Sequence, residues 1–511
     1  MKIGVDKLMT SNDVFKKCTD QDTWDKIIDF DNVSKMWENS VKLYANLPAI
    51  VDGETITYKE LDDKVKNFRA VLSENGVGVG DMVGIYMPNS SSFVVSYLAI
   101  TTLGAVAVLL PPQLDETALF GCSIKYSLKV ICYHQSLKEK ITFTSQKNPG
   151  VVLIDHTATS KNNANPVFVD KKAPCMVIFT GGTTGKNKGA LLSNQAVMVG
   201  TKNGCFGTKD VFNQRYFLVL PLTHVFGLIR NLLTTLYTGS VIFICRNNKD
   251  MFKEIAVFKP TIMVLVPALA EMALNLSKQF NRNLLGDDLK TIICGAAAVP
   301  PYLIKEYNKL GVSLLAGYGM TESANLISGN CDSLDFPESV GYFYGGMEYK
   351  IVDGELWIKG DNLFDGYWGE PEENKASFMD GWFKTGDLVR IDEGNRLYIV
   401  GRNKEVIVLP SGKKISPAEI EYNFLELDTV QDCLVYLDED EMLTLEVLPR
   451  TAVTNALNVA NIEEFLKEQI NNVNDKLPSY LKINKIIIRT TDFIRSPSMK
   501  IVRNQNGNAK K

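Results

Sequence analysis

Residues 178–193 read Ile-Phe-Thr-Gly-Gly-Thr-Thr-Gly-Lys-Asn-Lys-Gly-Ala-Leu-Leu-Ser. An apolar run ends at Phe179, and the nine positions 181–189 that follow hold four glycines. Glycines let several backbone N–H groups converge on one point, and the hydroxyl and ammonium groups around them add donors and positive charge. This composition favours an anion with many oxygens, such as phosphate. No register fits the pattern G-x-x-x-x-G-K-[ST], so the loop is not a Walker loop, and a flexible surface hairpin explains the same composition.

The whole chain has the composition of an ordinary globular protein. Its 511 residues are enough for two or more domains, and the 45% of apolar residues provide ample core. A net charge of −4 argues against a nucleic-acid partner. We expect no signal peptide and no transmembrane segment, because no apolar run is long enough. The nine cysteines are scattered singly without a C-x-x-C pair, which favours reduced thiols and a cytoplasmic location.

Helical and strand patterns alternate over most of the chain. Thr57-Tyr58-Lys59-Glu60 is a capping box that opens a helix, and further helices are expected at 91–103, 225–237 and 302–310. We expect strands at residues 83–87, 105–110, 129–133, 151–154, 175–179, 216–220, 241–244, 262–266, 291–294 and 312–315. This alternation predicts an α/β fold with parallel sheets flanked by helices.

The pattern changes after about residue 335. Short strand-like segments separated by Gly, Asp and Trp turns predict a small β subdomain over about 335–400. After Gly401 and Arg402 follows a segment of the size of a small α+β domain. We therefore divide the chain into a large N-terminal domain, residues 1–401, with two α/β sheet subdomains and the β subdomain, and a small C-terminal α+β domain, residues 402–511.

Five further stretches stand out once the loop is considered as a phosphate site. They are Pro221-Leu222-Thr223-His224-Val225-Phe226-Gly227, Gly317-Tyr318-Gly319-Met320-Thr321-Glu322-Ser323, Gly381-Trp382-Phe383-Lys384-Thr385-Gly386-Asp387-Leu388, Gly401-Arg402-Asn403-Lys404 and Ser498-Met499-Lys500-Ile501. Each is weak alone, but together and in this order they resemble the adenylate-forming superfamily. That superfamily includes acyl- and aryl-CoA synthetases, luciferases and the adenylation domains of peptide synthetases. The resemblance extends from about Thr57 to Arg503.

The resemblance implies a reaction in two halves. A carboxylate attacks the α-phosphate of ATP to give acyl-AMP and pyrophosphate, and a thiol then takes the acyl group. The glycine-rich loop would hold the β- and γ-phosphates through Thr180, Gly181, Gly182, Thr183, Thr184, Gly185 and Lys188. Gly181 and Asn187 replace a common Ser and Pro of the family pattern, so one hydroxyl and some rigidity are lost and weaker ATP binding is expected.

The same resemblance assigns the nucleoside end of ATP. The residues implied are Gly295, Ala296, Ala297, Tyr318, Gly319, Asp387 and Arg402. Small residues after a strand let adenine lie against backbone at the carboxyl edge of a sheet, where ligands bind in α/β folds. Tyr318 would stack on adenine. Asp387 would accept both ribose hydroxyls, because a carboxylate can accept two hydrogen bonds, and Arg402 would also reach the ribose.

Four residues are implied in the chemistry itself. Thr321 would contact the α-phosphate, and Glu322 would hold Mg²⁺, a hard cation suited to oxygen ligands. Lys500 belongs to the mobile C-terminal domain. It would move into the site and bridge the attacking carboxylate and the α-phosphate. His224, in Pro-Leu-Thr-His-Val-Phe-Gly, occupies the position at which amino-acid-activating members carry an Asp for the substrate ammonium.

The second half-reaction would use another face of the C-terminal domain. Lys404 occupies the family's hinge position between the two domains. The segment Ser411-Gly412-Lys413-Lys414 would line a tunnel for the thiol, with Gly412 and Lys413 as its main residues. Rotation of the small domain would exchange this segment for Lys500 between the half-reactions.

His224 makes an α-amino acid an unsuitable substrate, because an imidazole offers an ammonium no opposite charge. The Gly-x-x-x-Ser-Pro core from Gly412 to Pro417 is similar to long-chain fatty acyl-CoA synthetases, and the apolar residues around Val225 and Phe226 suit an aliphatic acid. The first hypothesis is therefore an ATP-dependent acyl-CoA synthetase that uses a fatty acid, Mg²⁺ and CoA. Alternatives are a non-amino aryl acid as substrate, the phosphopantetheine of a separate acyl carrier protein as acceptor, or a catalytically silent nucleotide-binding protein.

Overall fold

The apolar strand before the glycine-rich loop belongs to a seven-stranded sheet. In the computed structural model, β7 (Pro174–Thr180) pairs antiparallel with β8 (Lys188–Ser193), and Thr180 lies opposite Lys188. The structure describes residues 11–180, 188–409, 413–457, 461–495, 501–503 and 506, so the loop between the two strands lies outside it. The sheet has the order β18-β8-β7-β4-β3-β5-β6. Its remaining strands are β18 (Gly366–Tyr367), β4 (Val106–Leu109), β3 (Met82–Tyr86), β5 (Val130–Tyr133) and β6 (Val152–Asp155).

A second, nine-stranded sheet holds the middle of the chain. Its order is β15-β14-β13-β12-β11-β9-β10-β1-β2, and the strands from β13 to β1 run parallel. The strands are β15 (Tyr342–Phe343), β14 (Ser328–Gly329), β13 (Ser313–Tyr318), β12 (Thr291–Cys294), β11 (Ile262–Leu265), β9 (Arg215–Leu218), β10 (Val241–Ile244), β1 (Pro48–Asp52) and β2 (Glu54–Thr57). The prediction of parallel sheets is confirmed. The weakly patterned residues 1–53 contribute β1, which the sequence did not predict.

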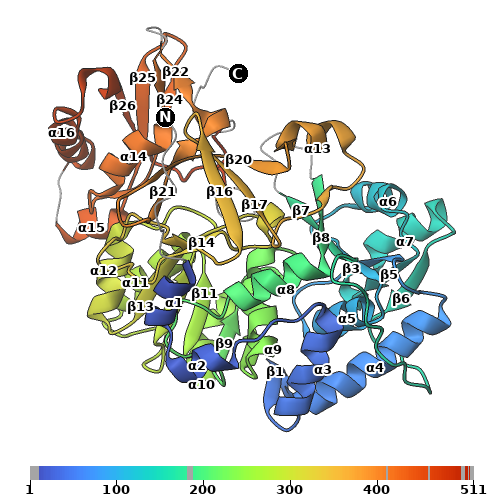
Figure 1. Cartoon of the computed structure of the whole chain (residues 1–511). Helices are drawn as coiled ribbons and strands as arrows, with labels where there is room; N and C mark the ends of the chain where they lie inside the picture. The colour runs from blue at the N-terminus through green and yellow to red at the C-terminus, as the bar shows by residue number, and fades with distance from the viewer. Residues whose placement is uncertain are drawn as a thin grey trace.

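Helices cover both sheets, and some lie between them (Figure 1). α8 contacts β7 and β8 of one sheet and the helical segment η2 beside the other. The Thr57 side chain and Glu60 form the predicted capping box at the start of α4. The helices of this part are α1 (Ser11–Cys18), α2 (Gln21–Lys26), α3 (Val33–Tyr44), α4 (Tyr58–Glu74), α5 (Ser91–Thr102), α6 (Glu116–Lys125), α7 (Lys138–Lys147), α8 (Asn194–Asn203), α9 (Thr234–Tyr237), α10 (Met251–Phe258), α11 (Pro267–Gln279) and α12 (Pro301–Lys309). One hydrophobic cluster runs through both large sheets and includes residues of α3, α4, α5 and α8 to α12, whereas α6 and α7 contribute to a second cluster on the seven-stranded sheet.

The helix predicted at residues 225–237 has an unusual form. Phe226–Leu233 (η2) is a π-helix, and the ordinary α-helix α9 begins only at Thr234. π-Helical turns are rare and are frequently found at functional sites. Gly227 makes this segment possible, because a Cβ there would lie 2.3 Å from the carbonyl oxygen of Pro221.

The β subdomain is a five-stranded antiparallel sheet. It contains β16 (Met347–Val352), β17 (Glu355–Gly360), β19 (Phe378–Met379), β20 (Trp382–Ile391) and β21 (Leu397–Arg402). The predicted range of about 335–400 also contains β15 and β18, which instead extend the two large sheets, and helix α13 (Pro371–Ser377). Strands this short carry too little sequence pattern to show which sheet they join.

The C-terminal part has its own hydrophobic core around Phe424, Leu445 and Leu466. Its three-stranded sheet joins β24 (Val430–Leu437), β25 (Leu443–Pro449) and β26 (Lys485–Ile488), and its helices are α14 (Pro417–Leu425), α15 (Thr451–Ala456) and α16 (Ile462–Asn474). β22 (Ile407–Val408) pairs with β23 (Lys414–Ile415). Across the described ranges, no helix combines the length and apolar character needed to cross a bilayer.

Candidate active site

Three backbone features meet at the carboxyl ends of β12 and β13. A Cβ at Gly295 would lie 3.2 Å from the carbonyl oxygen of Gly317 and 3.5 Å from the ring of Phe226. A Cβ at Gly319 would lie 1.4 Å from the carbonyl oxygen of Asn325, so that position requires glycine. Ala296 has φ 66°, a left-handed conformation that strains a residue with a Cβ, and Ala296 and Ala297 are exposed. The result is an open shelf of small residues at the edge of the nine-stranded sheet.

Tyr318, Asp387 and Arg402, far apart in the sequence, converge beside this shelf. The Tyr318 hydroxyl donates to Asp387 Oδ2 across 2.5 Å, and Arg402 Nε lies 3.2 Å from Asp387 Oδ1. Asp387 is buried on β20 directly opposite Arg402 on β21. Burial acts to lower the pKa of Arg402, but the charges of Asp387 and Glu405 outweigh it and raise that pKa. The sequence had named all three residues without showing that they touch each other.

Glu322 lies in the same cluster, in the short helix η4 (Thr321–Ser323). Its carboxylate is buried and accepts a hydrogen bond of 2.6 Å from the hydroxyl of Tyr367. Burial raises the pKa of Glu322, while the hydrogen bond from Tyr367 acts in the opposite direction. Asp387 and Arg402 are close enough to affect the same pKa. A buried carboxylate with few hydrogen-bond donors around it is suited to bind a cation.

Tyr367 and Glu373 are parts of the site that sequence reasoning missed. The Lys188 ammonium contacts the Glu373 carboxylate and lies 5.1 Å from the centre of the Tyr367 ring. Since Tyr367 also donates to Glu322, one chain of contacts links the end of the glycine-rich loop to the proposed metal ligand. The register of β18 on β8 creates this link by setting Tyr367 opposite Ala190, two residues from Lys188. No sequence motif indicates that pairing.

Thr321 and His224 each lie beside the start of a short helical segment. Thr321 is half-buried and opens η4, with Met320 between it and the Gly-Tyr-Gly turn. His224 is half-buried in the turn before η2, where its carbonyl oxygen accepts from the N–H of Leu228. Thr180 is half-buried at the end of β7.

Other predicted site residues lie outside this cluster or outside the described residues. Lys404 is exposed in η5 (Asn403–Glu405), and Lys413 is exposed beside the ring of Tyr480. Those outside the described residues are Gly181, Gly182, Thr183, Thr184, Gly185, Gly412 and Lys500.

The C-terminal part contacts the large domain through a buried ion pair. Arg450 Nη2 lies 2.9 Å from Glu271 Oε1 on α11, and the Arg450 guanidinium lies 4.5 Å from the centre of the Tyr302 ring. The Tyr302 hydroxyl donates to the same Glu271 carboxylate. This contact orients the small domain on α11 and α12.

Comparison with known proteins identifies the family. The AMP-binding enzyme family matches residues 37–368, and the AMP-binding enzyme C-terminal domain matches residues 404–509. The chain belongs to the AMP-binding enzymes. The Arabidopsis thaliana peroxisomal OPC-8:0-CoA ligase 1 is 27% identical over 493 residues, which cover 88% of each chain. The Escherichia coli medium-chain fatty-acid–CoA ligase is 26% identical over 451 residues, which cover 81% of this chain and 79% of the relative.

Solved structures of the same fold agree with this assignment. The anthranilate CoA ligase AuaEII, solved with anthranoyl-AMP, has a TM-score of 0.81 at 21% identity, and the match covers 93% of this chain and 96% of the other. The Bacillus subtilis o-succinylbenzoate CoA synthetase, solved with its acyl-adenylate, has a TM-score of 0.77 at 23% identity, with 93% and 98% covered. The predicted α/β fold of the adenylate-forming superfamily is confirmed.

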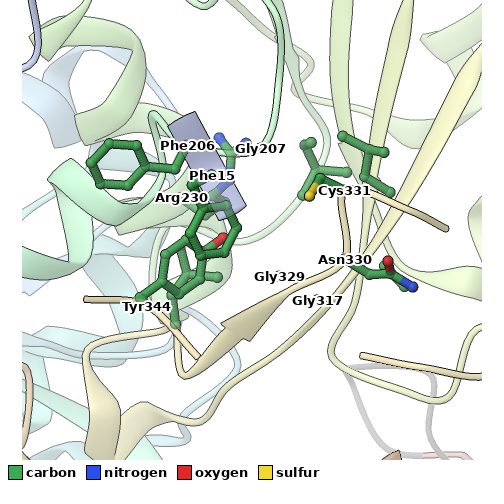
Figure 2. Close-up of a pocket in the computed structure, with 13 residues that line it drawn as sticks. Phe15, Phe206, Gly207, Arg230, Gly317, Gly329, Asn330, Cys331 and Tyr344 are labelled. Carbon is green, nitrogen blue, oxygen red and sulfur yellow. The ribbon is translucent and has the colours of Figure 1, made fainter. Parts of the chain in front are cut away.

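A small cavity in this AMP-binding enzyme lies between the end of β13 and the N-terminal helix α1. It has a free volume of about 20 Å³ and begins at Gly317 of β13. Arg230 of η2 and Phe15 of α1 line it as well, and Figure 2 shows their side chains close together. The other lining residues are Phe206, Gly207, Ile293, Leu315, Ala316, Leu326, Gly329, Asn330, Cys331 and Tyr344.

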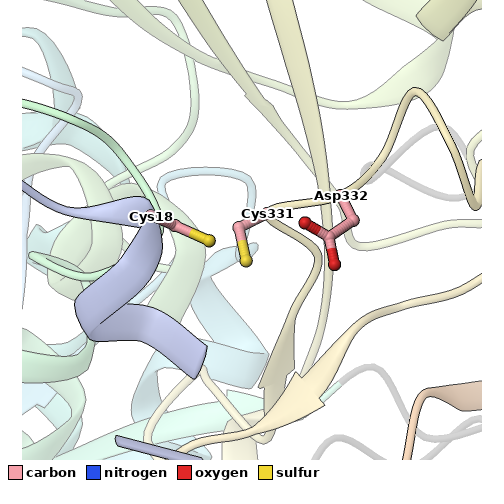
Figure 3. A group of neighbouring side chains, drawn as sticks. All are labelled: Cys18, Cys331 and Asp332. Atoms are coloured by element: carbon pink, nitrogen blue, oxygen red, sulfur yellow. The ribbon is translucent and has the colours of Figure 1, made fainter. Parts of the chain in front are cut away.

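Cys18 and Cys331 meet at the margin of this cavity, although 313 positions separate them in the sequence (Figure 3). Their sulfur atoms and a carboxylate oxygen of Asp332 all lie within 4.8 Å of one another. Both thiols are free and half-buried. The hydrogen bond from Cys331 lowers the pKa of Cys18, and the pKa of Cys331 is raised in return. Sequence spacing gave no sign of this pair, because the two cysteines come from different elements.

Proposed function

We propose that this protein joins a carboxylic acid to a thiol in two steps, with acyl-AMP as the intermediate. The acid first attacks the α-phosphate of ATP and releases pyrophosphate, and the thiol of CoA then attacks the acyl carbonyl and releases AMP. The observation that carries the proposal is the convergence of Tyr318, Glu322, Asp387 and Arg402 beside the shelf at Ala296. Relatives that span nearly the whole chain and are named CoA ligases support it.

The shelf of small residues and Asp387, with its partners Tyr318 and Arg402, are suited to bind the adenosine of ATP. Ala296 and Ala297, next to Gly295, expose backbone against which an adenine ring can lie, bounded by the turn at Gly319. Asp387 has about four lone-pair positions, so its carboxylate can accept ribose hydroxyls while Tyr318 and Arg402 fix its orientation. In this arrangement the Tyr318 ring stacks on adenine, and the Tyr318 hydroxyl orients Asp387.

Glu322 fits the role of a Mg²⁺ ligand. Its buried carboxylate has a neutral hydroxyl, that of Tyr367, as its hydrogen-bond donor, so a divalent cation can replace much of its lost hydration. When bound, Mg²⁺ neutralises charge on the phosphates that leave. Thr321 lies next to Glu322 in η4, and in this proposal it contacts the α-phosphate.

The remaining roles follow from family membership and the order of the motifs. Thr180, Gly181, Gly182, Thr183, Thr184 and Gly185 hold the β- and γ-phosphates, with Lys188 at the end of the loop. Lys500 bridges the two reacting anions, because two negative groups must be brought together and neutralised. His224 belongs to the part of the site that binds the carboxylic acid substrate.

The chain is divided into a large domain, residues 1–401, and a small domain, residues 402–511. Rotation of the small domain switches the site from the first half-reaction to the second. Lys404 lies at the exposed junction and acts as the hinge, and Gly412 with Lys413 lines the path of the thiol. Free cysteines in all nine positions support a cytoplasmic location.

Pyrophosphate release over a panel of carboxylic acids tests the proposal. We expect release that depends on the acid, ATP and Mg²⁺, and thioester formation once CoA is added. Acyl-AMP that accumulates with CoA but is consumed by a holo-carrier protein would identify a carrier protein as the acceptor. No pyrophosphate release with any acid would refute the proposed adenylation.

A further inference from the structure

We propose that Arg230 binds a second anionic group at the far end of the acid, so that the preferred substrate is a dicarboxylic acid or its anionic equivalent. This inference rests on the proposed function, because it assigns the cavity beside Gly317 to the acyl part of the substrate. It starts from a charge that the protein leaves without a counterion.

The Arg230 guanidinium is buried without an acidic partner. The residue is 2% exposed, and its Nη1 makes no hydrogen bond. Within the ranges that the structure describes, no carboxylate forms an ion pair with it. An arginine stays protonated under all ordinary conditions, so it cannot escape burial by losing its proton. An unpaired buried charge is costly, and a bound anion would compensate this one.

The polar neighbours of Arg230 cannot neutralise it. They are the Tyr216 and Tyr344 phenols and the Cys205 thiol, whose pKa values Arg230 acts to lower. Burial outweighs that influence and raises the pKa of Tyr216 and of Cys205 to about 12, so both stay uncharged at neutral pH. The hydroxyl of Tyr216 interacts with the Arg230 guanidinium and has no other hydrogen-bond partner among the described residues. The site therefore offers several donors and one positive charge, which is complementary to an anion.

The position of Arg230 connects this charge to the reaction site. It lies on η2, which begins two residues after His224 and brings Phe226 against Gly295. The cavity that Arg230 lines also includes Gly317, the first residue of the Gly-Tyr-Gly turn. An acid whose reacting carboxylate lies near Thr321 would therefore extend along Gly317 and Gly329 toward the guanidinium. In the π-helix Leu228 and Ile229 enter the core, while Arg230 lines the cavity.

Aromatic side chains line the cavity near Arg230. Phe15 stacks on Tyr344 with ring centres 4.6 Å apart, and Figure 2 shows Arg230 beside Phe15. The free volume of about 20 Å³ suffices for a water-sized group. A terminal carboxylate would enter by displacing these rings slightly, and it would lie in a site from which water is largely excluded. An ion pair in such surroundings is strong and selective.

Matched pairs of acids test the assignment. The two acids of a pair have the same number of carbon atoms. One is a monocarboxylic acid, and the other has a carboxylate at both ends. We expect wild-type kcat/KM, measured by pyrophosphate release, to favour the diacid by roughly 100-fold at the best chain length. Arg230→Met should remove that preference, and Arg230→Lys should keep part of it, because it retains the charge but not the planar fork.

Arg69 provides the matched control. It is also a buried arginine, 1% exposed, but it lies in α4 away from the cavity and donates to the carbonyl of Ala164. Arg69→Met should leave the preference for diacids unchanged. The assignment of Arg230 is overturned if wild-type enzyme favours the monocarboxylic acid of every pair and Arg230→Met leaves the ratio as it was.

A binding measurement separates failure of this inference from failure of the proposed function. Millimolar diacid without ATP should raise the melting temperature of wild type and not that of Arg230→Met. Equal shifts in both proteins would overturn the inference even if no acid gave pyrophosphate. Turnover of monocarboxylic acids alone would leave the adenylation intact and overturn only the role of Arg230.

Discussion

Arg450 and Glu271 join the small C-terminal domain to α11 by an ion pair of 2.9 Å, in which the Arg450 side chain is 6% exposed. Tyr302 contacts both partners, its ring below the guanidinium and its hydroxyl on the carboxylate. Both partners are largely shielded from solvent, since the Glu271 side chain is 16% exposed. The pair therefore stabilises the particular orientation of the small domain seen in Figure 1.

Glu271→Gln should destabilise this orientation. It leaves a buried guanidinium without its counterion, at a cost of about 3 kcal/mol. We expect faster cleavage by trypsin around the exposed Lys404 and a lower melting temperature. Asp288→Asn is the matched control, because it breaks the exposed pair of Asp288 with Arg215, worth less than about 1 kcal/mol. Equal proteolysis of wild type and Glu271→Gln would show that the pair does not hold the small domain.

Glu322→Gln should raise stability while it removes adenylation. Burial raises the pKa of Glu322 above its ordinary value, so between the unfolded and folded pKa values the folded protein holds a proton that the unfolded chain has lost. Stability from this group is therefore present below the unfolded pKa and is lost as pH rises through the folded pKa. At pH 8 the neutral glutamine avoids the cost of the buried charge, and the melting temperature should rise. A Mg²⁺ titration of pyrophosphate release identical to wild type would remove Glu322 from the metal site.

Tyr367→Phe should shift the acidic side of the activity profile to higher pH. The Tyr367 hydroxyl stabilises the ionised form of Glu322, so its loss raises the pKa of that carboxyl further. The variant should need more Mg²⁺ at pH 6 than wild type and approach it at pH 8. The pH dependence of the Mg²⁺ concentration at half-maximal rate measures this, and an unchanged dependence would contradict the link between the two residues.

Cys18 should be alkylated by iodoacetamide before Cys122 as pH rises. The thiolate is the reactive form, and the hydrogen bond from Cys331 lowers the pKa of Cys18, while burial raises the pKa of Cys122 to about 11. Both residues are half-buried, so Cys122 is a fair internal control. Mass spectrometry after short exposure at pH 7 and pH 9 measures the order. In Cys331→Ser the advantage of Cys18 should shrink, and equal labelling of the two thiols in wild type would contradict the assignment.

Lys500→Ala should abolish the first half-reaction and spare the second. If Lys500 bridges the attacking carboxylate and the α-phosphate, its loss removes charge neutralisation that only adenylation needs. Pyrophosphate release should fall by about 100-fold or more, whereas thioester formation from supplied acyl-AMP should stay near the wild-type rate. Lys404→Ala provides the contrast, since a change at the proposed hinge should affect both half-reactions. Survival of both half-reactions in Lys500→Ala would exclude it from the chemistry.

Local signals explain which parts of the fold were predictable. The capping box at Thr57 and Glu60, the apolar strands and the glycine turns depend on neighbours in the sequence, so the central parallel strands β3–β7 and β9–β13 were predicted within a few residues, whereas β1, β2, β8 and β14 were not. The two-residue strands β15 and β18 were not, because pairing with distant strands creates them. The π-helix was predicted only as a helix, since its wider turns come from packing of Gly227 against Pro221.

By itself, the sequence determined the family, the order of the nucleotide motifs and the identities of Tyr318, Glu322, Asp387 and Arg402, because each lies in a short pattern readable along the chain. Only the tertiary structure decided that Tyr318 and Arg402 hold Asp387 between them and that Tyr367 joins Glu322 to Lys188. Only the structure shows that Arg230 has no acidic partner among the described residues and lines the cavity proposed for the acyl group. The physical reason is that charge pairing and burial depend on distances across strands and sheets, which no spacing in the sequence records.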